Sequence, residues 1–296
     1  MLTKKQFDIL EIIIDSTKKI SQRELSEKTG MSIGSVNAVL KELITLGFVE
    51  SNHITQKGRD EMEKYRVKRA IVIAAGFGSR MVPITLNTPK PLVRVKGTRI
   101  VDSCLDALKE AGIEEVYLVR GYLAEQFDQL LYKYPNIKFI ENPLYNEANN
   151  LSSIVAAGDL LENAYIIEAD LLVYNKKIIT KYQYSSNYLG IPVERTDDWC
   201  VFVKGGYIHK MCIGGSGSNC YQMAGISYWT KEDGKKLYQY AKEVFNSPGG
   251  KERYWDQVPL EFYIKKFNVG VRPASFSDII EIDTFNELKK LDETYR

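Results

Sequence analysis

The 296-residue chain lacks the features that mark several classes of protein. No apolar stretch reaches the roughly 20 residues that a transmembrane helix needs, and charged residues interrupt the N-terminal apolar runs, so a signal peptide is not indicated. The 40 Lys and Arg residues nearly balance the 38 Asp and Glu residues, which excludes a single-sign field over the whole protein. Cysteines are few and form no CxxC pair, which excludes a zinc ribbon and a disulfide framework: Cys104, Cys200, Cys212 and Cys220. These absences predict a cytoplasmic protein with reduced thiols and no membrane partner.

The chain changes character near residue 66. Before that point, apolar residues recur at helical spacing among many charges, whereas VKRAIVIAAG, from Val67 onward, is a continuous apolar run typical of a buried parallel strand. The length also suits two domains, because domains usually hold roughly 100–200 residues. We therefore predict one domain over residues 1–66 and a second over residues 67–296.

The first domain reads as three helices followed by a small strand pair. An amphipathic helix is predicted over residues 3–18, and a second begins after Ser21, which with Glu24 forms a capping box. Gly30 ends the second helix, Ser32 caps a longer third one, and two short strands and a charged helix follow. The segment SQRELSEKTGMSIGSVNAVLKELITLGFVE resembles the winged helix-turn-helix.

That resemblance implies DNA as a partner, with the third helix in the major groove. The predicted recognition helix carries a single basic residue, Lys41, although each phosphate contact needs a cation. A helical interaction module without DNA binding is therefore the alternative.

In the second domain, apolar runs alternate with helical patterns. Strands are predicted over residues 70–75, 116–120, 138–143 and 164–170, and helices over residues 100–111, 123–132 and 152–161. Alternating strands and helices favour right-handed crossovers and a parallel sheet. The fold class is therefore α/β, a Rossmann-like, mostly parallel sheet preceded by a small winged-helix domain.

The turn after the first strand carries chemistry. Gly76 and Gly78 allow the backbone to approach a polyphosphate at the carboxyl edge of the sheet, where open α/β folds bind ligands. Arg80 supplies a fork-shaped cation and Lys90 a mobile one. No G-K-[ST] follows, and the third glycine of a dinucleotide fingerprint is missing, so both of those phosphate loops are excluded.

The whole string AAGFGSRMVPITLNTPKPL resembles the signature of the nucleotidyltransferases that act on sugar phosphates and on choline phosphate. The resemblance extends over nearly all of residues 67–296. It implies that Lys90 contacts the α-phosphate and that Arg80 steadies the departing pyrophosphate. The residues it implies for nucleotide binding are Ala74, Ala75, Gly76, Phe77, Gly78, Ser79, Arg80, Lys90, Gly121, Tyr122, Asn149, Asn150, Ser152 and Glu168.

Two carboxylates at predicted strand ends are candidates for a metal site. Asp170 ends the strand AYIIEAD, and Asp283 ends the strand DIIEID near the C-terminus. In the superfamily that the chain resembles, acids in such positions hold the divalent cation, which implies Mg²⁺ on Asp170 and Asp283. For Asp283, the alternative is an N-cap of the last helix.

Three aromatic-rich segments, DDWC, SYW and RYWDQ, suggest a site for an organic cation. A quaternary ammonium donates no hydrogen bond, so it needs aromatic faces and a nearby carboxylate. Together with the loop signature, the segments resemble bacterial choline-phosphate cytidylyltransferases, which implies a phosphocholine site at Asp198, Trp199, Tyr228, Tyr254, Trp255 and Asp256. For any single aromatic, a role in the core or in a lid is the alternative.

On this basis CTP and phosphocholine are the implied substrates, and CDP-choline and pyrophosphate are the products. No general base is needed, because the attacking phosphate oxygen is already ionised at neutral pH. The alternative acceptors are 2-aminoethylphosphonate, phosphoethanolamine and a sugar 1-phosphate. An alternative of another class is a transcription regulator that senses CTP or choline phosphate. His209, in the segment KGGYIHK, is expected to be structural.

Overall fold

The computed structural model describes residues 1–16 and 18–295, and the chain divides into two compact units. The helix unit consists of Met1–Val67 together with Lys181–Tyr184, and the sheet unit consists of Lys68–Thr180 and Ser185–Arg296. The division predicted after residue 66 lies one residue before the first of these borders. Nothing in the sequence analysis assigned Lys181–Tyr184 to the helix unit.

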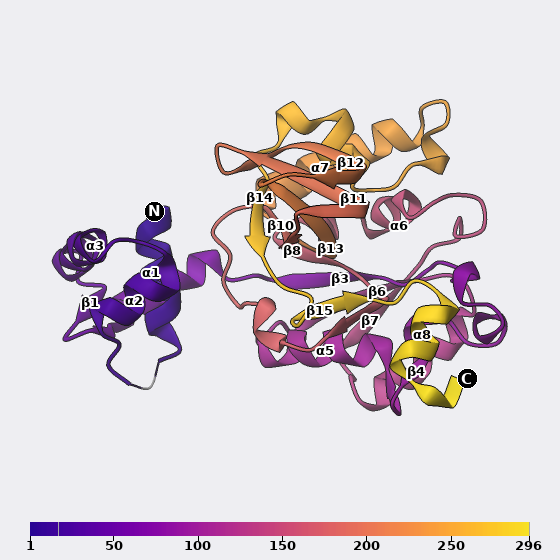
Figure 1. Ribbon diagram of the computed structural model, residues 1–296, viewed down its shortest axis with the longest axis horizontal. Coiled ribbons are helices and arrows are strands. Elements are labelled where there is room, and N and C mark those ends of the chain that lie inside the picture. Colours follow the sequence, from indigo (N-terminus) through magenta and orange to yellow (C-terminus); the bar gives the residue numbers. More distant parts are fainter. Residues whose placement is uncertain (17, 296) are drawn as a thin grey trace. The chain divides into compact units, whose positions relative to one another are not determined.

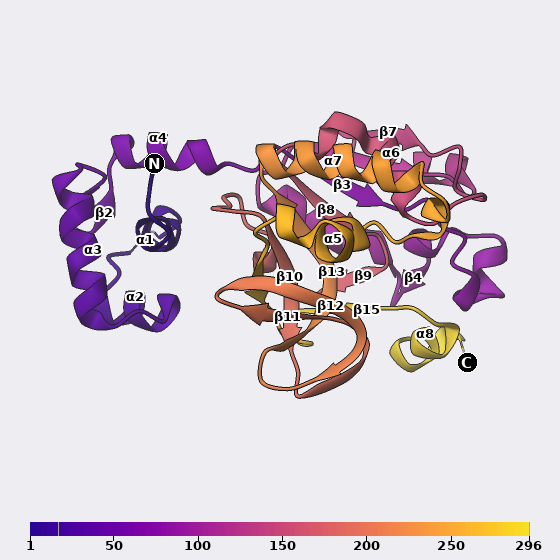
Figure 2. The ribbon, with the colours of Figure 1, turned by 90° about the horizontal axis from the view of Figure 1, so that it is seen from above.

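The helix unit has the element order of a winged helix, which confirms that part of the predicted fold. Its α1 lies among the other helices (Figure 2) and ends earlier than the predicted residue 18. The Ser21–Glu24 capping box is present, and Ser51 and Asn52 adopt positive φ in the strand turn. The elements are α1 (Lys4–Ile14), α2 (Gln22–Thr29), α3 (Ile33–Thr45), β1 (Val49–Glu50), β2 (His53–Ile54), α4 (Gln56–Met62) and η1 (Glu63–Tyr65).

The centre of the sheet unit is a block of four parallel strands in the order β8-β3-β6-β7, which confirms the predicted α/β fold. They are β3 (Arg69–Ile73), β6 (Glu115–Arg120), β7 (Ile137–Glu141) and β8 (Ala164–Glu168). In β3, only the first residue is not fully buried, as expected for a strand covered on both faces.

Antiparallel strands extend the sheet beyond β8. In Figure 1, β11 and β12 form a hairpin next to β13, and β13 pairs with β8. A further strand, β10, pairs with β13 on one side and runs parallel to β14 on the other. The strands are β10 (Asn187–Pro192), β11 (Arg195–Lys204), β12 (Tyr207–Ser216), β13 (Cys220–Trp229) and β14 (Gly270–Pro273). His209 lies in β12 with an exposed side chain.

Helices cover both faces of the parallel strands: α5 (Ile100–Glu110) lies on one face, and α6 (Leu151–Ala157) and α7 (Lys231–Phe245) lie on the other (Figure 1). Two predicted helices differ from the structure. The segment predicted as a helix over residues 123–132 is the 3₁₀ stretch η5 (Ala124–Tyr132), which starts after Leu123 at positive φ. The helix predicted over residues 152–161 stops at Gly158, whose φ of +59° ends the α-helical turn before η6 (Gly158–Leu161).

Short elements surround the carboxyl edge of the sheet. A small core formed by Met81, Ile282 and Leu288, among others, holds the loop after β3 against the C-terminal segment. The strands and helix are β4 (Arg94–Val95), β5 (Thr98–Arg99), β9 (Leu171–Val173), β15 (Ile279–Glu281) and α8 (Phe285–Leu291). The single turns are η2 (Ser79–Met81), η3 (Ile84–Leu86), η4 (Lys90–Leu92), η7 (Lys176–Ile178), η8 (Gly250–Glu252), η9 (Val258–Phe262), η10 (Ile264–Lys266) and η11 (Glu293–Tyr295). Across residues 1–16 and 18–295, every helix is too short or too polar to cross a membrane.

Candidate active site

The loop after β3 is packed tightly against Lys90. Gly78 has a φ of +63°, and a Cβ placed there would lie 2.9 Å from the Cβ of Lys90, so the position requires glycine. The Thr85 hydroxyl donates to the Gly78 carbonyl over 2.8 Å, and the Tyr122 hydroxyl donates to the Thr85 carbonyl over 3.0 Å. These hydrogen bonds therefore fix the conformation of the loop next to Lys90.

A cavity lies between this loop and the carboxyl ends of β3 and β8. Its polar lining is suited to a nucleotide, because backbone amides, amide side chains and cations converge there. Of the residues predicted to bind nucleotide, those that line it are Ala74, Gly76, Gly78, Ser79, Arg80, Lys90, Asn149, Asn150 and Glu168.

The other predicted nucleotide residues lie behind this cavity or beside it. Tyr122 holds the loop through its hydroxyl, its backbone N–H donates to the Ala75 carbonyl, and its ring lies 5.0 Å from that of Phe77. The buried Ser152 hydroxyl donates to the Asn149 carbonyl over 2.8 Å. Gly121 leaves room for Tyr145, whose Cβ would lie 2.5 Å from a Cβ placed at position 121. The structure thus places Ala75, Phe77, Gly121, Tyr122 and Ser152 in supporting positions rather than in the cavity wall.

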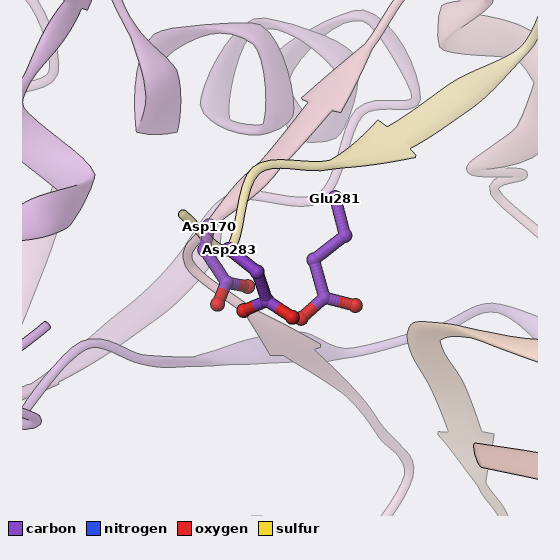
Figure 3. Close-up of side chains that lie close together, drawn as sticks. All are labelled: Asp170, Glu281 and Asp283. Carbon is purple, nitrogen blue, oxygen red and sulfur yellow. The ribbon is translucent and has the colours of Figure 1, made fainter. Parts of the chain in front are cut away.

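Three carboxylates lie close together beside this cavity, and two of them, Asp170 and Asp283, line it. Asp170, Glu281 and Asp283 each offer an oxygen within 4.8 Å of the others, and Figure 3 shows all three side chains pointing into the same space. Asp170 follows β8, while the other two come from the end of β15. The pairing of Glu281 with Leu171, and the hydrogen bond from the Ile282 amide to the Asp170 carbonyl, fix the two segments in register.

Two cations balance this acidic cluster. The Lys90 ammonium donates to Asp170 over 2.7 Å and to Asp283 over 3.1 Å. The Arg80 guanidinium contacts both oxygens of Asp283, over 3.0 Å and 2.6 Å. Burial on its own would lower the pKa of Lys90, but the charges of Asp170 and Asp283 outweigh it and raise the pKa, so Lys90 stays protonated.

The cluster fits a divalent cation. Partial desolvation by the surrounding protein and repulsion from Asp170 and Asp283 raise the pKa of Glu281, and a bound cation would relieve that repulsion. One Asp170 oxygen, Oδ1, is buried without a hydrogen-bond partner among the described residues. Oxygen ligands of this kind are those that Mg²⁺ prefers.

The structure corrects one alternative and adds one residue. Thr284, not Asp283, caps α8, and its side chain accepts from the Glu287 amide. Glu281 was not predicted, although it lies two residues before Asp283, a spacing that puts both side chains on one face of an extended segment.

A second cavity adjoins the first: Asp170 and Asp283 line both, and Glu281 lines the second. The rings of Trp199 and Tyr254 form one wall, with centroids 5.8 Å apart at 65°. Asp198 and Asp256 also line this cavity, together with Tyr188, Met211, Ile213, Met223 and Gly225. Four of the six residues predicted for the acceptor are therefore in its wall.

Asp256 and Glu168 place two acidic groups beside these rings. Burial raises the pKa of Asp256 to about 7, against the lowering effect of a backbone amide and the Tyr188 hydroxyl. Its Oδ1 is shielded from solvent and has no hydrogen-bond partner among the described residues. Burial and the charges of Asp256 and Asp170 raise the pKa of Glu168 as well. A cationic ligand in this cavity would stabilise the ionised form of both groups.

Two predicted acceptor residues are placed elsewhere. Trp255 is buried, its ring packs against Tyr188 and Trp229, and its indole N–H donates to Glu168 over 2.8 Å. Trp255 therefore positions Glu168 through this hydrogen bond and does not line the cavity. Tyr228 is buried at the far end of β13, and its hydroxyl donates to Asn163 over 2.9 Å. Tyr228 is therefore part of the core.

Comparison with protein families gives two matches. Residues 70–213 match the family described as MobA-like NTP transferase domain. Residues 2–50 match the family described as winged helix-turn-helix DNA-binding.

Among curated proteins, the chain is 38% identical to a 2-aminoethylphosphonate cytidylyltransferase of Lancefieldella rimae over 76% of this chain and 92% of that protein. It is 33% identical to a choline-phosphate cytidylyltransferase of Haemophilus influenzae over 74% of this chain and 93% of that one. A solved structure of CTP:phosphocholine cytidylyltransferase from Streptococcus pneumoniae aligns with a TM-score of 0.70 at 30% identity, over 78% of this chain and all of that chain. An inositol-1-phosphate CTP transferase from T. maritima, 20% identical over 78% of this chain and 94% of that chain, shares the fold with a TM-score of 0.62.

Proposed function

The chain belongs to the cytidylyltransferases with a MobA-like NTP transferase domain, and from this premise we propose that it transfers CMP from CTP to 2-aminoethylphosphonate. A phosphonate oxygen forms a P–O–P anhydride with the α-phosphorus as the bond to the β-phosphate breaks, so the products are CMP-2-aminoethylphosphonate and pyrophosphate. The sequence prediction favoured phosphocholine, which remains the second candidate acceptor.

The observation that carries this choice is the Asp256 carboxylate, which lines the acceptor cavity and keeps one oxygen, Oδ1, without a hydrogen-bond partner among the described residues. A buried acceptor without a partner costs about 1–3 kcal/mol, and a ligand that donates to this carboxylate recovers part of that energy. A primary ammonium has N–H donors, whereas a trimethylammonium group has none. Glu168, beside Asp256, adds a second acidic group for the same ammonium.

Phosphocholine is supported by the aromatic wall. Trp199 and Tyr254 present ring surfaces in the cavity that contains Asp198 and Asp256, and a quaternary ammonium binds such surfaces with about 2 kcal/mol per desolvated contact. Similarity to choline-phosphate cytidylyltransferases over most of the chain supports it too.

Residues of one cavity would bind the triphosphate, and residues of the other would bind the acceptor. Arg80 and Lys90 face the nucleotide cavity, where they would stabilise charge on the triphosphate as the bond to the α-phosphorus breaks. The acceptor cavity would hold the ammonium end, so that an ionised phosphonate oxygen points back toward the nucleotide. No side chain needs to remove a proton, because the phosphonate is ionised at neutral pH.

Mg²⁺ fits the acidic cluster, with Asp170, Glu281 and Asp283 as its protein ligands. When bound, it would neutralise negative charge on the phosphates of both substrates. Lys90, which contacts Asp170 and Asp283, also lines the nucleotide cavity, so its charge lies beside both the acidic cluster and the triphosphate position.

The test is a panel of acceptors at fixed CTP and Mg²⁺, with pyrophosphate release as the readout. We expect the highest kcat/KM with 2-aminoethylphosphonate, a lower value with phosphoethanolamine and phosphocholine, and none above background with glucose 1-phosphate. A higher kcat/KM with phosphocholine would make it the acceptor in place of the phosphonate. Turnover of the sugar phosphate alone would refute both.

We also propose that the helix unit binds DNA, because residues 2–50 match a winged helix-turn-helix DNA-binding family. Lys41 is the only basic residue of α3, so the affinity should be modest and strongly dependent on salt. A gel shift with promoter DNA at increasing salt tests this. Failure to bind at low salt would favour a protein-interaction module.

A further inference from the structure

Four residues from the middle of the chain complete the helix unit. Lys181–Tyr184, called the strap below, belongs to that unit although more than 110 residues of the sheet unit precede it. The Val67 amide donates to the Lys181 carbonyl over 2.9 Å, and the Gln183 amide donates to the Tyr65 carbonyl over 3.0 Å. The strap is thus hydrogen-bonded to the end of the winged helix like an added strand.

Two tyrosines of the strap fill the core of the helix unit. Tyr182 is buried among its apolar residues, and its hydroxyl donates to Glu63 over 2.6 Å. The Tyr184 ring stacks on Tyr65 at 5.7 Å and lies 5.5 Å from Phe7, and its hydroxyl donates to the Leu2 carbonyl. Without the strap, these partners in α1 and η1 would be exposed.

Both ends of the strap continue directly into anchored parts of the sheet unit. On the N-terminal side, the Tyr165 hydroxyl donates to the Thr180 carbonyl over 3.0 Å and accepts from the Thr180 amide over 3.2 Å. On the C-terminal side, the Ser186 hydroxyl donates to Asp233 over 2.6 Å, and the Ser186 carbonyl accepts from the Gly270 amide. The residues on either side of the strap, Thr180 and Ser186, are therefore fixed by hydrogen bonds within the sheet unit. Movement of the strap away from the helix unit would strain these bonds or break the contacts of Tyr182 and Tyr184.

These fixed points lie close in sequence to the proposed active site. Tyr188, which lines the acceptor cavity, comes four residues after Tyr184 in strand β10. Before the strap, the chain runs from Asp170 through β9, which pairs with the strand that ends in Glu281. The segment that completes the helix unit is therefore continuous, on both sides, with segments that form the proposed substrate and metal sites.

We propose that the strap couples the helix unit to the ligand state of the sheet unit, so that bound nucleotide stabilises the winged helix. The physical basis is linkage: opening of the sheet unit frees the anchored ends of the strap and so exposes the core of the helix unit, and a ligand that binds only the folded sheet unit lowers the population of that open state. The coupling is independent of the acceptor, since it needs only CTP and Mg²⁺ in the sheet unit.

The test is amide hydrogen exchange of the full chain, with and without saturating CTP and Mg²⁺. CTP without an acceptor is not consumed by the proposed reaction, and protection of residues 76–79 serves as the control for its binding. We expect exchange in α1 and α3 to slow, up to the limit of about 100-fold that linkage allows at a nucleotide concentration of 100 times Kd. Unchanged exchange in α1 and α3, with residues 76–79 protected, would overturn the proposal.

Variants of the strap give the second arm. In the double variant Tyr182→Ala, Tyr184→Ala, we expect exchange in α1 to become faster and insensitive to CTP, while protection of residues 76–79 persists. Tyr132→Ala, at a fully exposed tyrosine of the sheet unit, is the matched control and should keep the wild-type response. Persistence of the CTP effect on α1 in the double variant would refute the strap as its route.

Conservative variants keep the test valid if the double variant does not fold. Tyr182→Phe and Tyr184→Phe retain the rings and remove the hydroxyl groups, which donate to Glu63 and to the Leu2 carbonyl. Each should speed exchange in α1 by roughly five-fold, the effect of one hydrogen bond, and should leave the CTP response in place. Exchange in α1 unaltered by both changes would show that the strap does not hold the helix unit.

Discussion

The substitution Asp256→Asn separates a hydrogen-bonding role of this carboxylate from a purely electrostatic one. Asparagine keeps the size of the side chain and removes its charge, so the Coulomb attraction is lost for either acceptor. Only a primary ammonium also donates a hydrogen bond to this carboxylate, and the neutral amide oxygen of asparagine accepts that bond more weakly; phosphocholine has no N–H donor. The difference between a hydrogen bond to a charged acceptor and one to a neutral acceptor is about 1.5 kcal/mol, which corresponds to roughly ten-fold in kcat/KM. We therefore expect selectivity for 2-aminoethylphosphonate over phosphocholine to fall by about ten-fold.

The assay compares kcat/KM for the two acceptors at saturating CTP, by pyrophosphate release, in the wild type and the variant. The KM for CTP should stay within about two-fold, because Asp256 lines the acceptor cavity and not the nucleotide cavity. Asp197→Asn is the matched control, since Asp197 is highly exposed and pairs only with Arg195 among the described ion pairs. An equal loss for the two acceptors, or a large rise in the KM for CTP, would refute the reasoning.

Three further predictions follow from the same site. Chelation of divalent cations should abolish turnover. The substitution Glu281→Gln should raise the Mg²⁺ concentration that gives the half-maximal rate by about ten-fold or more. If this concentration does not change, Glu281 is not a ligand of the metal. Since burial raises the pKa of Asp256 in the folded protein to about 7, the ligand-free protein binds more protons than the unfolded chain between about pH 4 and 7, and stability should fall as pH rises through that range. Urea unfolding of Asp256→Asn should show a shallower slope with pH, and an identical slope would contradict the assignment. Tyr228→Phe should lower the unfolding free energy by about 1 kcal/mol through loss of the hydrogen bond to Asn163 and leave the acceptor KM unchanged; a raised KM would return Tyr228 to the acceptor site.

The central fold was predictable because its signals are local. A continuous apolar strand followed by a glycine turn predicts the loop after β3, and strand ends in a parallel sheet meet at one edge. That rule is enough to bring Asp170 near the loop. It did not indicate Glu281, because one carboxylate of a strand end looks like any other until the pairing of β15 with β9 fixes which side chains face the cavity.

Adjacent aromatic residues could not be told apart from sequence. Tyr254 lines the acceptor cavity, whereas the next residue, Trp255, is buried beneath it and donates to Glu168. The turn geometry around residue 254 decides which ring faces inward, and composition carries no signal for it. The prediction for Tyr228 was wrong for a different reason. Met223 and Gly225 of strand β13 line the cavity, but Tyr228 lies farther along that strand, beyond the cavity.

The strap had no sequence signal at all. KYQY reads as an ordinary polar and aromatic turn between two strands, and only tertiary packing joins it to residues more than 110 positions earlier. Contacts between segments so distant in sequence are set by the whole fold and not by local periodicity.

This feature also limits how the protein can be divided. A winged helix fused to the front of an enzyme is commonly treated as a module that can be removed or exchanged at the linker. Here a cut after Val67 would leave Tyr182 and Tyr184 on the remaining enzyme without the core they fill, and would leave the excised helices with Phe7 and Tyr65 uncovered. Gain or loss of the helices, in evolution or in the laboratory, therefore requires matching changes at two separate places in the gene.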